Sequence, residues 1–281
     1  MAIGGPRGSL QRLARLLAVP TAGFVIVLAG CAMFQDHLLY FPTRAGLDSI
    51  EVEAKAAGAR PWPNSGEAHR GFVVEPRDGT AVGTVVLFHG NAGYALHRRH
   101  WAEALGRLGW RTILAEYPGY GARSGAVGER SMVPDAIESL RLAHEQFGDP
   151  SVLAGEALGA GVAAAAAART DVPLRGVLLM TPWADLPSLA QEKVPFLPVR
   201  LILRDRYDTI ANLAAIDAPV AICIAEEDEV IPTHHSERLF EAIPEPKRCW
   251  WFPGRGHNDW PVGAHEPWWG EVMAYLSGGD G

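Results

Sequence analysis

The sequence is poor in cysteine and in clusters of basic charge. Cys31, Cys223 and Cys249 are its only cysteines, and three thiols cannot form a disulfide framework. A chain of 281 residues is long enough for a core that needs no such crosslinks. Cys223 and Cys249 lie on expected core strands, so we expect both to be free, buried thiols. The net charge is −7, and no Lys/Arg stripe follows the first 20 residues, which argues against nucleic acid as a partner.

Clusters of metal-ligating residues are also lacking. His97 and His100 stand three residues apart on an expected helix. No Cys or carboxylate set lies near them in the sequence, so a solvated helix face is favoured over a zinc site. We therefore expect no metal and no other cofactor.

One long uncharged stretch is present, from Leu16 to Gln35, and it follows three arginines at positions 7, 12 and 15. The run Leu16–Phe34 is just long enough to span a bilayer. The preceding arginines would then hold the N-terminus in the cytoplasm and place the rest of the chain outside. A buried core helix is disfavoured because Pro20 and Gly23 interrupt the run.

The same stretch also fits an export signal, with a basic region, an apolar region and small residues at a cleavage site. Leu28-Ala29-Gly30-Cys31 resembles the bacterial lipobox, in which the signal is removed and the cysteine becomes lipidated. An uncleaved anchor, a lipoprotein and an ordinary signal peptide therefore remain open. All three predict a protein exported to the extracytoplasmic side, and the first two predict a membrane-anchored one.

The rest of the chain alternates buried strands with helices of 10–15 residues, which predicts an α/β fold with a mostly parallel sheet. We expect residues 1–35 to be the signal or anchor and 36–281 to be a single, monomeric domain, with a small lid-like insertion at 183–217. The expected strands are 69–74, 84–88, 112–116, 151–156, 176–180, 220–225 and 249–252, and the expected helices are 97–108, 133–147, 158–169, 233–242 and 266–276.

The most distinctive stretch runs from Ser151 to Gly161. An apolar strand pattern passes through a Gly-x-x-x-Gly turn directly into an Ala-rich helix pattern. Gly155 and Gly159 flank the turn, where strand and helix cross with no room for a Cβ atom. The residue at the centre of the turn is Ala157.

Five ordered motifs carry a resemblance to a known family. In chain order they are His89-Gly90-Asn91-Ala92-Gly93, Tyr117-Pro118-Gly119-Tyr120-Gly121 with Ser124-Gly125, the Gly155–Gly161 turn, Asp228-Glu229-Val230-Ile231-Pro232 and Gly256-His257-Asn258-Asp259. In this order and spacing, residues 36–276 resemble the membrane-anchored α/β-hydrolases, a group that includes serine-aminopeptidase-like proteins and depalmitoylase-like thioesterases. The resemblance implies an α/β-hydrolase fold with a doubly wound sheet, helices on both faces and a small lid.

The resemblance also implies a catalytic triad. Its nucleophile position, the centre of the G-x-S-x-G turn, is Ala157 here. His257 would exchange a proton with the nucleophile, and Asp228 would orient the imidazole. Three glutamates beside Asp228 are rivals by charge alone, but the acid of the family stands four residues before the proline that is Pro232 here. The His-Gly usual before this loop is replaced by Ile224-Ala225.

The surroundings of the triad are implied in the same way. Backbone N–H groups of Leu158 and of Asn91 or Ala92 would form an oxyanion hole. Trp183 and Trp260, on loops at the carboxyl ends of strands, either line an acyl pocket or pack in the core. Residues 194–198 either form a lid that faces acyl chains or the membrane, or pack on the core.

Ala157 decides what activity the sequence supports, because alanine cannot attack a carbonyl or carry an acyl group. The resemblance implies a serine-type hydrolase of ester, thioester or amide bonds in a small acyl, ester or peptide substrate. The chain is then an inactivated hydrolase, or a weak one in which His257 activates a water. The alternative is a non-catalytic pseudoenzyme that binds an acyl or peptide ligand.

Overall fold

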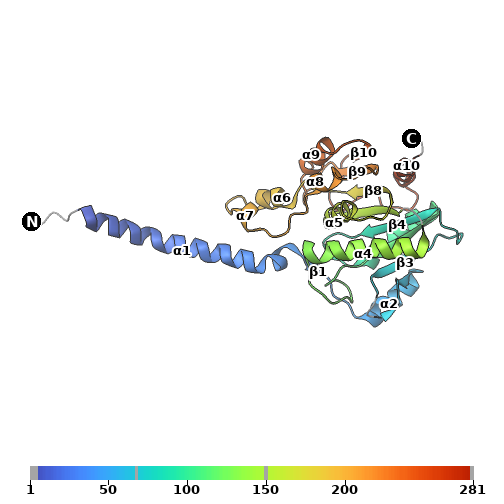
Figure 1. Cartoon of the computed structure of the whole chain (residues 1–281), viewed down its shortest axis with the longest axis horizontal. Helices are drawn as coiled ribbons and strands as arrows, with labels where there is room; N and C mark the ends of the chain where they lie inside the picture. The colour runs from blue at the N-terminus through green and yellow to red at the C-terminus, as the bar shows by residue number, and fades with distance from the viewer. Residues whose placement is uncertain (1–5, 67–68, 149–150, 279–281) are drawn as a thin grey trace, which may run out of the picture.

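The structure is a computed structural model that describes residues 6–66, 69–148 and 151–278 (Figure 1). Its centre is an eight-stranded sheet. The strands are β2 (Arg60–Trp62), β3 (Gly71–Val74), β4 (Gly83–Phe88), β6 (Trp110–Ala115), β7 (Ser151–Glu156), β8 (Leu174–Met180), β9 (Val220–Ala225) and β10 (Lys247–Phe252). Their order is β10-β9-β8-β7-β4-β6-β3-β2. Neighbours from β10 to β6 are parallel, and β3 and β2 are antiparallel additions at one edge. The expected α/β-hydrolase fold with a mostly parallel sheet is confirmed.

Helices cover both faces of this sheet (Figure 1). They are α2 (Leu47–Ala56), the 3-10 helix η2 (Ala95–Arg98), α3 (Arg99–Arg107), α4 (Glu129–Phe147), α5 (Leu158–Ala167), α6 (Leu186–Lys193), α7 (Val199–Ile202), α8 (Thr209–Leu213), α9 (His234–Ala242) and α10 (Pro267–Leu276). Alternate residues of β4 show the two layers. Val86 and Phe88 belong to the core cluster beneath α4 and α5, and Val85 and Leu87 belong to the cluster beneath α3 and α10. Because β4 is buried on both faces, most of its sequence is a continuous apolar run rather than an alternation of apolar and polar residues.

Two of the differences from the sequence expectation have a clear physical reason. Helix α4 begins at Glu129, four residues before the expected Val133, because Gly128 takes a φ of 112° that turns the chain into the helix. Strand β2 was not expected, since proline is rare inside strands. Among the described strands it pairs only with β3, at the edge of the sheet, where Pro61 removes no hydrogen bond that a second neighbour would need.

The two core-strand cysteines are free, as expected, and they lie on opposite faces of the sheet. Cys223 is fully buried among the side chains beneath α10, whereas Cys249 is half-buried and packs against the other cluster. The expectation that both are buried therefore holds only for Cys223. Side chains of neighbouring strands that point to opposite faces cannot form a disulfide without backbone movement.

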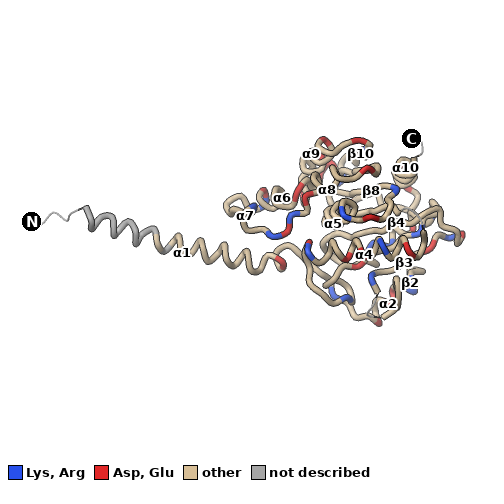
Figure 2. Tube along the Cα trace, in the orientation of Figure 1, with Lys and Arg blue, Asp and Glu red and all other residues tan. Residues whose placement is uncertain are grey.

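The N-terminal helix α1 (Pro6–Leu39) projects away from the domain (Figure 1). Its segment Pro20–Leu39 is long and apolar enough to cross a membrane. The mean hydropathy of this segment is 1.6, and only 6% of its most apolar stretch is buried in the protein. A signal sequence near an N-terminus has the same character. In the sequence Asp36 is the one charged residue between Pro20 and Leu39, and in Figure 2 most of this part of α1 is drawn without the colours of charged residues. The arginine side chains at positions 7, 12 and 15 lie outside the described part of the helix.

The end of α1 is joined to the domain by a small two-stranded sheet. Strand β1 (Phe41–Pro42) runs parallel to β5 (Ala92–Gly93), which lies in the loop after β4. Phe41 is in register with Ala92. The residues that follow the apolar helix are therefore fixed beside the carboxyl end of the central strand.

Candidate active site

Ala157 occupies a strained turn between β7 and α5. Its backbone angles are φ 51° and ψ −109°, a region that non-glycine residues rarely adopt. Its N–H donates to the carbonyl oxygen of Met180 at 3.0 Å. The flanking glycines are required by close packing, because a Cβ atom on Gly155 would lie 2.2 Å from the Gly159 oxygen, and one on Gly159 would lie 1.9 Å from the Phe88 oxygen. This backbone geometry presents the side chain of residue 157 alone above the sheet.

The turn lies at the topological switch point of the sheet. Strands β4 and β7 are neighbours, and the chain continues from them toward opposite edges, which is where ligand sites of such sheets form. A cavity of about 350 Å³ opens here. Its lining includes Tyr40, Asn91, Ala157, Leu158, Trp183 and His257.

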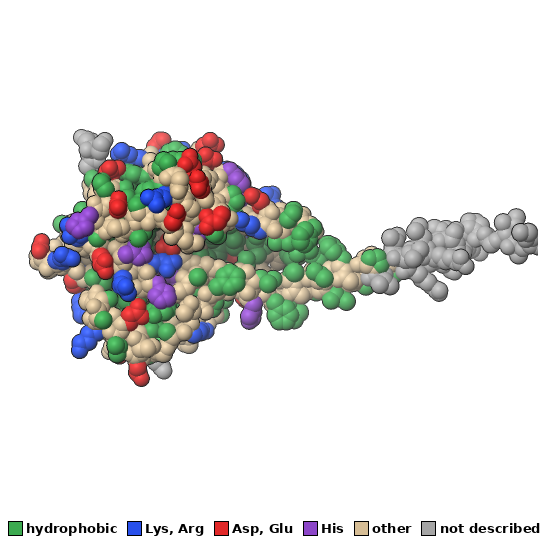
Figure 3. All heavy atoms as spheres, turned by 180° about the vertical axis from the view of Figure 1, so that it is seen from behind, with side chains coloured by type: hydrophobic (Ala, Val, Ile, Leu, Met, Phe, Trp, Pro, Cys, Tyr) green, Lys and Arg blue, Asp and Glu red, His purple; other side chains and the backbone are tan. Residues whose placement is uncertain are grey.

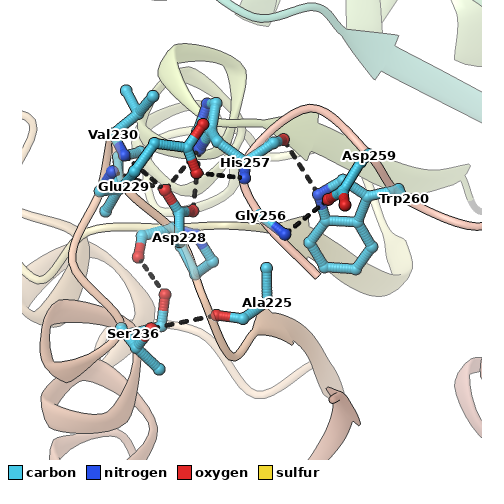
Figure 4. Close-up of polar contacts among 12 residues, drawn as sticks. Ala225, Asp228, Glu229, Val230, Ser236, Gly256, His257, Asp259 and Trp260 are labelled. Carbon is cyan, nitrogen blue, oxygen red and sulfur yellow. Dashed lines mark hydrogen bonds and ion pairs between the residues drawn. The ribbon is translucent and has the colours of Figure 1, made fainter. Parts of the chain in front are cut away.

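His257 and Asp228 meet at the edge of this cavity (Figure 4). The imidazole Nδ1 lies 2.8 Å from Oδ2 and 2.9 Å from Oδ1 of the carboxylate. Asp228 is held in turn by the N–H groups of Val230 at 2.9 Å and Ile231 at 2.7 Å. The exposed fractions of the two side chains are 11% for His257 and 2% for Asp228. With Nδ1 as the donor to Asp228, Nε2 is the nitrogen that remains to act as a base.

Two of the three neighbouring glutamates, Glu226 and Glu229, bind the loop backbone instead. Glu229 accepts a hydrogen bond from the N–H of His257 at 3.0 Å, and Glu226 accepts one from the N–H of Gly254 at 2.8 Å. Asp228 is thus the carboxylate that contacts the ring, and Glu226 and Glu229 support the histidine loop.

The three residues expected to supply N–H groups all line the cavity. Leu158 is the first residue of α5, and a first-turn N–H has no acceptor within its own helix. Ala92 lies in β5 and pairs with Phe41 of β1. The side chain of Asn91 binds the end of α1, with Nδ2 donating to the Leu39 oxygen at 2.6 Å and Oδ1 accepting from the Phe41 N–H at 3.1 Å.

The comparisons with known proteins agree with this architecture. A family model described as the alpha/beta hydrolase fold matches residues 83–216. An uncharacterized protein of Mycobacterium tuberculosis (strain ATCC 25618 / H37Rv) is 34% identical over 88% of this chain and 90% of its own. The chain belongs to the α/β-hydrolase family.

Two solved structures show how widely the fold of this α/β-hydrolase is shared. A thermophilic esterase from the Planctomycetes species Thermogutta terrifontis matches with a TM-score of 0.59 and 17% identity, over 78% of this chain and 92% of its own. The monoacylglycerol lipase of Paleococcus ferrophilus matches with a TM-score of 0.54 and 22% identity, over 73% and 96%. At these identities the likeness concerns the fold.

The two tryptophans assigned to the pocket of the α/β-hydrolase lie in different places. Trp183 is part of the cavity lining, and its indole N–H donates to the backbone carbonyl oxygen of Tyr207 at 3.2 Å. Trp260 is not among the lining residues. Its ring packs against Phe252, with centroids 4.7 Å apart, and its N–H donates to the His257 oxygen at 3.1 Å (Figure 4). Trp260 therefore supports the histidine loop from the core, as the alternative of core packing predicted.

Glu156 was expected to point away from the site, and this expectation is wrong. Glu156 and Arg98 both line the cavity, joined by two hydrogen bonds of 2.8 Å and 2.7 Å. Burial raises the pKa of Glu156, but the charge and hydrogen bonds of Arg98 outweigh it and leave the pKa below its usual 4.5. The sequence contains no local signal for this pair, because its members are 58 residues apart.

The end of α1 was also missed as part of the site. Leu39, Tyr40 and Phe41 line the cavity, although they follow the anchor directly. The Tyr40 hydroxyl donates to Oδ2 of Asp205 at 2.5 Å, which ties this segment to the chain beyond α7. The aromatic pair directly after the apolar helix was the one available signal.

Among the described residues, one group has the geometry to hold a metal ion, formed by Glu192, His234 and His235. The Glu192 carboxylate lies 3.0 Å from the His234 ring and 3.1 Å from the His235 ring. None of the three lines the cavity. His97 and His100, for which the sequence favoured a solvated helix face over a zinc site, do not belong to this group.

Proposed function

We propose that this chain has the site of a serine-type hydrolase acting on ester, thioester or amide bonds, with Ala157 at the position of the nucleophile. One observation carries the proposal. Ala157, which lies in a strained turn, and His257 line the same cavity. His257 is in turn bound to Asp228. Ordinary loop histidines do not require a buried carboxylate partner that is itself held by two backbone N–H groups.

With a serine at position 157, each group has a defined task. His257 Nε2 takes the hydroxyl proton as the oxygen attacks the carbonyl carbon, and it later protonates the leaving group. Asp228 fixes the tautomer and stabilises the imidazolium. The N–H of Leu158, with that of Asn91 or Ala92, stabilises the oxyanion. Water then releases the acyl group and regenerates the hydroxyl.

With alanine at position 157, no acyl-enzyme forms. The remaining groups still bind and polarise a carbonyl, which in serine hydrolases leaves an acceleration on the order of 10³–10⁴ over water. The second candidate function is a pseudoenzyme that binds an acyl or peptide ligand without turnover, and Ala157 itself favours it.

Labelling with a fluorophosphonate tests the proposal. The Ala157→Ser variant should label and should hydrolyse short activated esters several orders of magnitude faster than the unsubstituted chain. Adding His257→Ala to that variant should abolish both gains, because a lone serine is a weak nucleophile. A folded Ala157→Ser protein that neither labels nor cleaves any ester or thioester in a broad panel rejects the hydrolase in favour of the binding module.

The proposed location is the extracytoplasmic face of a membrane, with residues 1–35 as the anchor or signal, 36–281 as a monomeric domain and 183–217 as its lid. The apolar helix and the arginines that precede it support this proposal. Mass spectrometry of the mature N-terminus separates the forms: lipid on an N-terminal Cys31 indicates a lipoprotein, and an intact Met1 or Ala2 indicates an uncleaved anchor. A full-length protein in the soluble cytoplasmic fraction rejects both.

A further inference from the structure

A second cavity of about 360 Å³ lies between the end of α1 and the α6–α7 segment. We name it the anchor groove. Its lining includes Cys31, Leu38, Ala190, Val194, Leu197 and Leu203. Its size is within the range of ligand sites in proteins. It is built by the membrane-span candidate on one side and by the expected lid on the other.

The anchor groove continues the candidate active site. Leu39, Leu189 and Val230 line both cavities. Val230 lies two residues after Asp228, whose carboxylate holds its N–H at 2.9 Å. A ligand with its carbonyl at residue 157 therefore has an adjoining apolar space on the side of the anchor.

The polar groups of the anchor groove are already engaged. Gln35 donates to the Ile202 oxygen at 3.3 Å and accepts from the Arg204 N–H at 2.8 Å. The Lys193 ammonium donates to the Glu229 oxygen at 3.3 Å. A peptide in this groove would bury backbone groups without enough partners, and that is unfavourable. A hydrocarbon chain carries no such groups.

The surface around the groove is apolar as well (Figure 3). Large hydrophobic side chains on both sides are exposed, with exposed fractions of 57% for Phe34, 60% for Leu38, 76% for Phe196 and 84% for Leu201. Figure 3 shows hydrophobic side chains gathered where α1 meets the domain. Exposed apolar surface beside a membrane-span candidate is typical of a face that contacts acyl chains.

The frame of the groove is fixed by polar contacts. Asp36 pairs with Arg204 at 2.7 Å, and the Tyr40 hydroxyl donates to Asp205 at 2.5 Å. These contacts hold the last turns of α1 at a set position relative to the segment after α7. The space between them is thus part of the folded domain.

We propose that the anchor groove binds the long acyl chain of a membrane-lipid ester whose carbonyl lies beside residue 157. This inference rests on the proposed function and names its substrate class. The acyl chain enters sideways from the bilayer, between α1 and α6–α7. The alcohol part of the ester occupies the cavity lined by Arg98 and Glu156. The apolar rim favours a lipid ester over an acylated peptide, whose backbone would need polar partners there.

A photoreactive lipid tests the site in the protein as it stands. The full-length protein in phospholipid nanodiscs is irradiated with a monoacylglycerol whose palmitoyl chain ends in a diazirine. Because Ala157 cannot form an acyl-enzyme, the probe is consumed only slowly. Crosslinks are expected within 31–39 and 189–203.

Ala190→Trp fills the groove without touching the first cavity, and it should lower labelling by about tenfold or more, since each buried methylene contributes about fourfold in affinity. Val52→Trp, at an exposed position on α2 that lines neither cavity, should keep labelling within about twofold.

Hydrolysis in the Ala157→Ser background separates the two proposals. Activity should rise from acetyl through butyryl and octanoyl to palmitoyl glycerol esters, and Ala190→Trp should remove the gain for the long esters while leaving acetyl ester hydrolysis intact. Melting temperatures confirm that both tryptophan variants fold. If all esters, acetyl included, are inert, the proposed function fails, and the crosslinks alone then decide the acyl site.

Several results overturn the acyl site. They are equal rates for acetyl and palmitoyl esters, crosslinks outside both segments, or Ala190→Trp labelling equal to that of Val52→Trp. If a lipid covalently bound to Cys31 blocks the crosslink, the groove holds the protein's own lipid anchor. Faster cleavage of an S-palmitoyl peptide than of the lipid ester would assign the source to acylated protein.

Discussion

Two walls enclose the cavity around Ala157, and they are built in different ways. The sheet wall is backbone against backbone, with Gly159 so close to Phe88 that a Cβ atom would lie 1.9 Å from its oxygen. The anchor wall is made of side chains from α1 and α6, held by contacts such as Tyr40 to Asp205. The sheet wall is fixed by the geometry of the main chain, and the anchor wall is fixed by side chains, which can be substituted.

This difference separates chemistry from selectivity. The sheet wall positions residue 157 and the Leu158 N–H within a frame that accepts no larger residue at its glycines. The anchor wall can change in shape without disturbing the central strands, because its residues pack at the edge of the cavity. Substrate choice in the proposed enzyme is therefore expected to depend on the anchor wall, and reactivity on the sheet wall.

The largest effect is expected from the groups that act beside the sheet wall. In the Ala157→Ser background, His257→Ala should lower kcat by on the order of 10⁶, because it removes the base. Asp228→Asn should lower kcat by on the order of 10⁴, because the base remains but its tautomer and its imidazolium form are no longer stabilised. The measurement is kcat for an activated acetyl ester. Ser124→Ala, at an exposed serine outside the cavity, is the control. Equal losses from His257→Ala and Ser124→Ala would contradict the assignment.

The rigidity of the sheet wall can be tested by Gly159→Ala. The added methyl group overlaps the Phe88 oxygen, so the free energy of unfolding should fall by about 3 kcal/mol or more. Gly270→Ala is the matched control, because its Cβ atom would lie 4.0 Å from the nearest atom in the middle of α10. It should raise stability by about 0.5–1 kcal/mol. Urea denaturation measures both, and a mild effect at Gly159 would mean that the turn relaxes.

The anchor wall should respond more gently. Tyr40→Phe removes the hydroxyl that donates to the buried Asp205 at 2.5 Å, and it should lower the free energy of unfolding by about 1–3 kcal/mol. Tyr275→Phe is the control, because its buried hydroxyl has no hydrogen-bond partner among the described residues. That substitution should be close to neutral. Thermal denaturation in detergent compares the two, and equal effects would show that the Asp205 contact does not stabilise the wall.

The smallest effect concerns the pH dependence of the Arg98–Glu156 pair. The pKa of Glu156 is lowered in the folded state, so the unfolded chain binds more protons as pH falls below the usual 4.5. The pair thus contributes stability above that pH and loses it as pH falls through the folded pKa. Glu156→Gln should reduce the stability difference between pH 7 and pH 3, because the variant has no carboxylate whose pKa differs between the folded and unfolded chains. Urea midpoints at the two pH values measure it, and an unchanged difference would show that the pair does not titrate.

The sequence by itself determined most of the strands and helices along the chain, though not β2 or the helices within 183–217, and it determined the geometry of the Gly155–Gly159 turn. These features are local, because an apolar run of strand length, a helix period and a glycine each restrict the backbone within a few residues. The absence of the nucleophile also needed nothing beyond the identity of residue 157.

Only the tertiary structure decided which side chains surround that residue. Arg98 reaches Glu156, Tyr40 reaches Asp205 across 165 residues, and Trp260 packs beneath the histidine loop and leaves the cavity. The end of α1 joins the site because β1 pairs with β5. Contacts of this kind depend on how whole elements pack, and the local pattern of apolar and polar residues is the same whether or not the partner is there.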